Sequence, residues 1–281
     1  MRSSLLLSAA AVAACTLASS VDASRSGVPA LVFPVVGSVT YSDDFGQARP
    51  GGTHEGNDLV ADKRAPAVAV EPGTVKYWKT SANAGCMLYL YGESGTMYEY
   101  IHLNNDLTAA NDNKGTCTKG VAYAVPNNAR VDTGQVIGYV GDSGDANGIH
   151  PHLHFEVHPK GKEAVDPYPF IKRAPHLLVA APPAGGAFTL RLTGTVVTSA
   201  AGRLSLKVDA LMSWPSHLKQ SKVNRMVTLT LPADPAATSA APADPPAAGD
   251  AIIAWTLPSP GTLAALTGAP GALSLDRFVS R

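Results

Sequence analysis

The sequence predicts a mainly β protein with two β-rich regions joined by a proline-rich segment. Its 281 residues include 26 glycines and 22 prolines but only 6% aromatic residues, a balance that favours a turn-rich fold. Apolar residues recur in short or alternating runs, and the first region lacks a sustained helical period. The formal net charge is zero. Because the chain has no lysine- or arginine-rich run, we expect neither nucleic-acid binding nor electrostatic membrane attachment.

The first 23 residues have the pattern of an export signal. A positive charge at Arg2 precedes the apolar run Leu5–Ala14, which at about ten residues is too short to span a bilayer. Val21-Asp-Ala23 offers a small-residue cleavage site, whereas Val12-Ala-Ala-Cys15 is similar to a bacterial lipobox with a lipidated cysteine. We therefore expect an exported protein of the periplasm, cell envelope or extracellular space, free or anchored at Cys15, without a transmembrane span.

The three cysteines divide into one in the signal and a pair. With Cys15 assigned to the signal or its anchor, Cys86 and Cys117 remain together in an oxidising compartment. A bridge between them closes a loop of roughly 30 residues and stabilises the fold by about 3–4 kcal/mol in the chain-entropy model. Two free thiols are the alternative, and zinc ligation is disfavoured because neither cysteine lies in a ligand-spaced cluster. We predict a disulfide.

Residues 30–173 are expected to form one β-rich domain of short strands separated by glycine and proline turns. The insert 104–128 is polar and is expected to be a surface loop, with its middle tied back by the disulfide. The expected strands are Leu31–Val39, Ala67–Val70, Gly73–Trp78, Met87–Tyr91, Met97–His102, Gln135–Val140 and His152–Val157.

The rest of the chain is expected to be a second, smaller domain. Residues 174–187 read as a linker by composition, and residues 188–281 as a small antiparallel β-barrel or sandwich of unknown role. The Ala/Pro/Asp-rich stretch 232–250 is expected to be a disordered loop. Five strands are expected there: Phe188–Val197, Arg203–Val208, Val227–Leu231, Ala251–Leu257 and Leu273–Phe278.

The segment Gly148–His158 carries the densest chemistry in the chain. His152 and His154 alternate with apolar residues, and a period of two places both imidazoles and Glu156 on one face of a strand. Two imidazoles on one face can both bind a single metal ion, or one can bind while the other acts beside it. The alternative is a half-buried strand with solvent-facing histidines.

A second motif, His54-Glu-Gly-Asn-Asp58, supplies one nitrogen and one oxygen donor. Four extended residues span about 13 Å, so the segment must bend for both side chains to bind one ion, and Gly56 offers that freedom. His154 or His152 would complete three zinc ligands, leaving the other as a general base. A third histidine in a strand-like context is His102.

These motifs together resemble the lysostaphin/LytM-type zinc metallopeptidases. The resemblance covers Pro34–Phe170 and rests on His-x-Gly-x-Asp, Tyr-x-His-Leu and a glycine-rich turn before His-Leu-His-Phe-Glu. It also includes the segments that begin at Ala65 and at Gly134. Each motif alone is weak, whereas their shared order and spacing are specific.

The resemblance implies an antiparallel β-sheet metallopeptidase domain with one Zn²⁺ ion, which hydrolyses peptide bonds of bacterial peptidoglycan. It implies that His54, Asp58 and His154 are the metal ligands and that His152 is the general base. His102 would then position water or stabilise the oxyanion. We expect a monomer whose partner is a peptidoglycan peptide.

Two features depart from the family pattern, and two alternative functions remain. His150 is an additional histidine that we expect to be exposed, and insert 104–128 is expected to wall one side of the substrate groove. Some family members lack the ligands and regulate other wall hydrolases, so a non-catalytic exported regulator or binder is one alternative. A peptidase of secreted proteins is the other.

Overall fold

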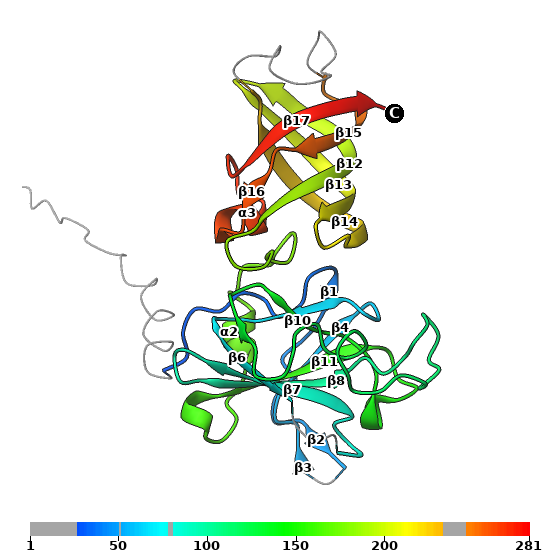
Figure 1. The fold of residues 1–281 in the computed structure, drawn as a ribbon, viewed down its shortest axis with the longest axis vertical. Coiled ribbons are helices and arrows are strands. Elements are labelled where there is room, and N and C mark those ends of the chain that lie inside the picture. The colour runs from blue at the N-terminus through cyan, green and yellow to red at the C-terminus, as the bar shows by residue number, and fades with distance from the viewer. Residues whose placement is uncertain (1–26, 51, 78–80, 233–245) are drawn as a thin grey trace, which may run out of the picture.

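The computed structural model describes residues 27–50, 52–77, 81–232 and 246–281. Strands dominate these residues, and the large sheet and a smaller barrel lie at opposite ends of the molecule (Figure 1). The prediction of a mainly β chain is confirmed. The expected export signal, including Cys15 and the alternative cleavage site at Ala23, lies outside the described residues.

The first region is built on a seven-stranded sheet in the order β1-β4-β11-β8-β7-β6-β9, with every neighbouring pair antiparallel. Apolar side chains of its inner face form one core with the segments packed on it. Its strands are β1 (Val39–Thr40), β4 (Asn57–Ala61), β6 (Gly73–Tyr77), β7 (Cys86–Gly92), β8 (Met97–Leu103), β9 (Arg130–Val131) and β11 (His152–His158).

Two smaller strand pairs complete this region. β5 (Pro66–Val68) pairs with β10 (Val136–Tyr139), and β2 (Ala48–Arg49) pairs with β3 (Gly52–Thr53). The expected strand 31–39 is wrong over most of its length. Its buried residues lie beside β5 and are joined to it by isolated backbone hydrogen bonds, such as Val36 N to Pro66 O. Only Val39–Thr40 joins the sheet.

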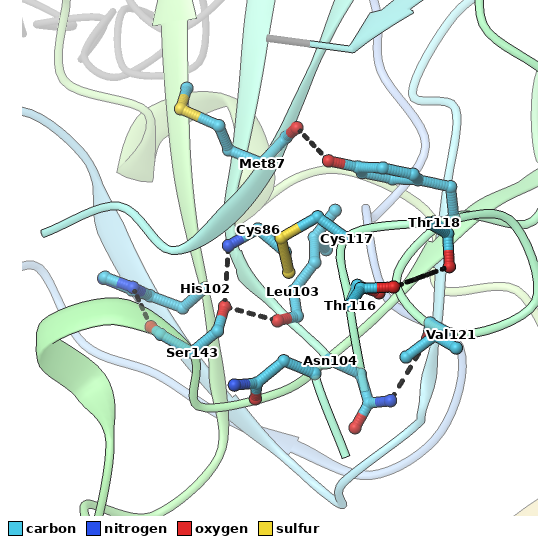
Figure 2. The surroundings of a disulfide bond; sticks show 12 residues. Cys86, Met87, His102, Leu103, Asn104, Thr116, Cys117, Thr118, Val121 and Ser143 are labelled. Carbon is cyan, nitrogen blue, oxygen red and sulfur yellow. Dashed lines mark hydrogen bonds between the residues drawn. A yellow bond between two sulfur atoms is a disulfide. The ribbon is translucent and has the colours of Figure 1, made fainter. Parts of the chain in front are cut away.

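The insert 104–128 is only partly the surface loop that its polarity suggested. Its far end is buried, because Tyr123 enters the core and stacks on Tyr77 with ring centroids 3.8 Å apart. The predicted disulfide between Cys86 and Cys117 is present, with Cα atoms 5.1 Å apart, and ties the insert to β7 (Figure 2). The apolar residues near its end thus add to the core.

The second region is a closed five-stranded barrel. β12 pairs with β13, β13 with β14, β14 with β17, β17 with β15, and β15 again with β12, so no strand of the circuit has a free edge. The pairing thereby selects a barrel over a sandwich. The strands are β12 (Ala187–Ala200), β13 (Arg203–Trp214), β14 (Lys219–Thr230), β15 (Ala251–Thr256) and β17 (Leu273–Ser280), with β16 (Ser259–Pro260) beside β12.

The segment 174–187 is packed between sheet and barrel. Leu177, Leu178 and Val179 are buried in the barrel's hydrophobic cluster, which also contains Val36 and Val68 from the first region. The segment's backbone forms hydrogen bonds with both regions, such as Ala181 N to Gly134 O in the first and Leu178 N to Leu266 O in the second. We propose that residues 30–173 and 188–281 are separate domains, with this packed segment between them.

Helices are short in the described part of the chain. None of its helices is long and apolar enough to cross a membrane. The expected disordered loop 232–250 lies largely outside the described residues, but its end is ordered, because Val196 N donates to Asp250 O and Gly249 N to Val196 O. The helices are η1 (Gly144–Ala146), η2 (Pro159–Gly161), α2 (Tyr168–Ile171) and α3 (Leu263–Thr267).

Candidate metal and catalytic site

Strand β11 carries the predicted alternation of apolar and polar residues. Leu153, Phe155 and Val157 are fully buried in the core, whereas His152, His154 and Glu156 lie on the opposite face of the sheet. β4 lies on one side of β11 and places Asp58 directly opposite His154. The pairing of these two strands therefore brings the two sequence motifs together.

Three of the predicted site atoms form a tight triangle. His54 Nε2 lies 3.1 Å from Asp58 Oδ1 and 2.9 Å from His154 Nδ1. Asp58 Oδ1 and His154 Nδ1 are 3.1 Å apart. Ligand atoms around a tetrahedral zinc ion, with bonds of about 2.0–2.1 Å, lie roughly 3.3 Å apart. Two imidazole nitrogens and one carboxylate oxygen at this spacing fit Zn²⁺.

The second ring nitrogen of each of these histidines is already bonded. His54 Nδ1 donates to the carbonyl oxygen of Asp44 at 2.9 Å, and His154 Nε2 lies 2.9 Å from Glu156 Oε1. A carbonyl or carboxylate can only accept, so these bonds leave His54 Nε2 and His154 Nδ1 available as ligand atoms. Sequence reasoning placed Glu156 on the site face without assigning it this role.

The pKa values of the triangle reflect its close contacts. Burial disfavours the charged carboxylate of Asp58, but hydrogen bonds from His154 and His54 outweigh it and hold the pKa of Asp58 well below its usual range. Burial also opposes protonation of His154, yet the bonds to Asp58 and Glu156 raise its pKa to about 9. A cation is favoured among these atoms, and a metal ion would replace a proton there.

The two remaining predicted residues, His152 and His102, stand side by side next to the triangle. Their ring centroids are 5.0 Å apart, and His152 Nε2 lies 3.7 Å from Asp58 Oδ1. Each donates Nδ1–H to a backbone carbonyl, His152 to His150 and His102 to Ser143 (Figure 2). Both Nε2 atoms are therefore proton acceptors when the rings are neutral.

Burial keeps both of these rings neutral. It lowers the pKa of His102 to about 4, with further lowering from His152 and His154. Burial also lowers the pKa of His152, although Asp58 partly opposes this effect. Near neutral pH, two neutral imidazoles with free Nε2 lone pairs therefore stand beside a cation-favouring triangle, as a general base requires.

His102 reaches this face through a break in the alternation of β8. Tyr98 and Tyr100 point into the core, so a regular strand would send His102 to the core as well. The backbone of His102 instead has φ 60°, a left-handed conformation uncommon for residues other than glycine. This break shifts the alternation of side chains by one residue, so that His102 faces the site while Leu103 enters the core.

The histidines line a pocket of about 800 Å³ on this face, together with apolar residues such as Ile101 and Ala146. His150 is exposed at its edge, as expected. The expectation that insert 104–128 walls the pocket is wrong for the described lining, which includes no residue of the insert. The insert instead contacts a neighbouring turn, since Asn111 and Asn113 bond Asn147.

One further site contact had no sequence signal. Arg49, on the β2–β3 hairpin, donates to Asp58 Oδ2 at 2.8 Å and so occupies the carboxylate oxygen that faces away from the triangle. It lies nine residues before Asp58 and belongs to none of the motifs. The approach depends on the fold of the hairpin.

Comparison with known proteins agrees with this geometry. The family model described as Peptidase family M23 matches residues 52–167. The L-Ala–D-Glu endopeptidase of Bacillus subtilis is 27% identical over 157 residues, which cover 52% of this chain but only 44% of that relative. The chain thus spans less than half the length of this relative.

Solved structures are similar over about half of the chain. The catalytic domain of lysostaphin from Staphylococcus simulans is 25% identical, with 48% of this chain and 92% of that one covered and a TM-score of 0.36. A zinc-containing peptidase from Vibrio cholerae is 23% identical, with 49% and 39% covered and a TM-score of 0.36. The match to the family model, independently of these structures, assigns residues 52–167 of this chain to a Peptidase family M23 domain.

Proposed function

We propose that this protein is an exported zinc metalloendopeptidase that hydrolyses peptide bonds in bacterial peptidoglycan. The observation that carries the proposal is the triangle of His54, Asp58 and His154 with two neutral histidines, His152 and His102, beside it. Three ligands and adjacent free bases are what metal-assisted hydrolysis requires. The family and the name of the Bacillus subtilis relative support a peptidoglycan substrate and a cellular location outside the cytoplasm.

In this mechanism His54 Nε2, Asp58 Oδ1 and His154 Nδ1 would hold the zinc. When bound, zinc supplies a Lewis acid that polarises the scissile carbonyl and activates water. His152 Nε2 accepts the proton that the attacking water loses and passes it to the leaving amine as the C–N bond breaks. The proton balance closes within one turnover.

His102 has a narrower role than the sequence allowed. Because its Nδ1–H is donated to Ser143 O, the neutral ring offers only an acceptor at Nε2. An acceptor can orient the attacking water but cannot donate to an oxyanion. Of the two roles expected for His102, the positioning of water fits its tautomer.

The pocket also supports a peptide substrate. Ile101 and Ile149 provide apolar contacts beside the charged groups Arg49 and Asp145. Such a mixture suits a short peptide that carries both alkyl side chains and carboxylates. An exported location accords with this substrate, with Cys15 or Ala23 as the proposed end of the signal.

The proposal is tested by zinc content and digestion of purified peptidoglycan. We expect about one tightly bound zinc per chain, lost in Asp58→Ala and His154→Ala together with activity. His152→Ala and His102→Ala should keep this zinc and lose turnover, and His217→Asn, in the barrel, serves as the matched control. Zinc retained in Asp58→Ala would overturn the ligand assignment.

The digestion assay also separates the alternatives. If the protein binds zinc and the wall but does not cleave it, the protein is a non-catalytic regulator rather than an enzyme. If it cleaves soluble peptides but does not digest the wall, its substrates are secreted proteins rather than peptidoglycan.

A further inference from the structure

A second group of metal-ligating side chains lies farther along the same strand. Past His154, β11 places Glu156 and His158 on the same face, and β8 places Glu99 directly opposite Glu156. One donor atom from each of the three side chains lies within 4.8 Å of the other two. This trio is separate from the triangle of His54, Asp58 and His154.

The donor atoms of the trio point at one another. His158 Nε2 lies 2.6 Å from Glu156 Oε2 and 3.6 Å from Glu99 Oε1. These distances bracket the roughly 3.3 Å that separates ligand atoms of a tetrahedral zinc ion. His158 Nδ1 donates to Lys162 O at 2.7 Å, which leaves Nε2 as the ligand nitrogen, as for His54.

The trio is also acidic and largely buried, and it has no lysine or arginine partner in the described part of the chain. The side chains of Glu156, His158 and Glu99 are only 9%, 12% and 14% exposed. Like charges directly opposite on neighbouring strands are destabilising. Among the described residues, histidines alone form ion pairs with the two carboxylates, and no lysine or arginine does.

Glu156 connects the two clusters. Its Oε1 lies 2.9 Å from His154 Nε2 and its Oε2 lies 2.6 Å from His158 Nε2, so each oxygen serves one histidine. Glu156 can therefore bind a cation through Oε2 while Oε1 keeps the bond that orients His154. We propose that Glu99, Glu156 and His158 bind a second divalent transition-metal ion of the zinc type.

This second site should be the weaker of the two. It offers one imidazole and two carboxylates, whereas the first has two imidazoles, and zinc binds nitrogen ligands well. Its donor atoms are also less evenly spaced than the three contacts of about 3 Å in the first site. The inference concerns metal binding by the full chain and does not depend on peptidase activity.

Titration of the metal-free full chain with Zn²⁺, followed by calorimetry and equilibrium dialysis, tests the proposal. We expect two zinc ions per chain with separable affinities. His158→Ala and Glu99→Gln should each lose the weaker ion and keep the tighter one. Asp58→Ala should do the reverse, and His217→Asn should keep both, with circular dichroism confirming that each variant is folded.

The outcomes separate this proposal from the proposed function. A wild-type chain that binds a single zinc overturns the second site, as does a second zinc that survives both His158→Ala and Glu99→Gln. If the tight ion is insensitive to Asp58→Ala while another depends on Glu99 and His158, the second site stands and the catalytic assignment fails.

Discussion

A Cβ atom on Gly56 would lie 2.8 Å from Nε2 of His154 and 2.6 Å from the carbonyl oxygen of Phe155. The backbone between His54 and Asp58 thus lies directly against β11. The chain bends at Gly56, as expected, but Gly56 has no positive φ, so a left-handed backbone is not what requires glycine here. Glycine is needed there because no side chain fits between the two ligand-bearing segments.

Gly56→Ala should therefore damage the metal site. The added methyl group must displace His154 or the β11 backbone, and we expect zinc affinity to fall at least about tenfold. Overpacking should also lower the free energy of unfolding by about 1–3 kcal/mol. Gly52→Ala is the matched control, since a Cβ there meets nothing within 4 Å. Equal zinc affinity of the two variants by competition titration would contradict this role of Gly56.

Lys63→Met should destabilise the turn that orients His102. Lys63 Nζ lies 2.5 Å from Asp106 Oδ2 and 3.1 Å from Asp142 Oδ2, and all three side chains are at most 13% exposed. Removal of the cation leaves two buried carboxylates without an opposite charge, a loss of about 3–5 kcal/mol. Urea unfolding measures it, with Lys76→Met on the exposed side of β6 as control. Similar midpoints for both variants would refute this role of Lys63.

The same substitution should slow catalysis more than it weakens zinc binding. Asp142 precedes Ser143, whose carbonyl oxygen accepts the His102 Nδ1–H bond and whose hydroxyl donates to Leu103 O. We expect a lower kcat with the tight zinc retained. Unchanged kcat in folded protein would show that the turn does not depend on Lys63.

Replacement of both Cys86 and Cys117 by alanine should lower the free energy of unfolding by about 3–4 kcal/mol. The bridge joins residues 31 apart and holds insert 104–128 against β7 (Figure 2). Urea denaturation of oxidised wild type and the double variant measures the loss. The reduced wild type should match the variant, and equal stability of all three would show that the bridge does not constrain the unfolded chain.

Stability should fall as the pH drops through the histidine range because of His176. Its ring stacks on buried Phe33 with centroids 3.8 Å apart, and burial, then Arg225, lowers its pKa. The unfolded chain takes up this proton near pH 6.5, whereas the folded chain resists it, so the stabilisation is present above that pH and lost below it. Thermal unfolding at several pH values follows the effect.

His176→Phe keeps a ring on Phe33 but cannot titrate. We expect the melting temperature of this variant to rise relative to wild type as the pH falls from about 7.5 to about 5.5. His217→Asn, at an exposed histidine, should leave the wild-type pH dependence unchanged. A constant difference between His176→Phe and wild type would exclude His176 as the titrating group.

A chain ending at Arg173 should keep the tight zinc and cleave small wall peptides, but with reduced stability. All five proposed ligand and catalytic residues precede this point. Truncation exposes Val32, Val36 and Val68, which pack in the barrel's cluster, and a fully exposed valine costs about 1.5–3 kcal/mol. Thermal unfolding and peptide digestion measure both effects. A folded chain without activity would make the barrel part of the catalytic unit.

Local patterns in the sequence determined much of this protein. The alternation in residues 152–157 predicts the strand, its buried face and the shared face of the histidines, because side-chain direction along a strand repeats every two residues. The resemblance carried by the ordered motifs implies the donor set that meets in space, and cysteine counting predicts the Cys86–Cys117 bridge. The strand and the bridge depend only on residue type and spacing, whereas spacing alone left His152 and His154 as alternative ligands.

The tertiary structure alone decided how these groups meet. The left-handed backbone at His102, the approach of Arg49 to Asp58 and the need for glycine at 56 all arise where segments distant in sequence pack together. The register between β8 and β11 likewise sets Glu99 opposite Glu156. A sequence pattern specifies which face a side chain takes on its own strand, but its neighbour on the next strand depends on a register set by the whole core.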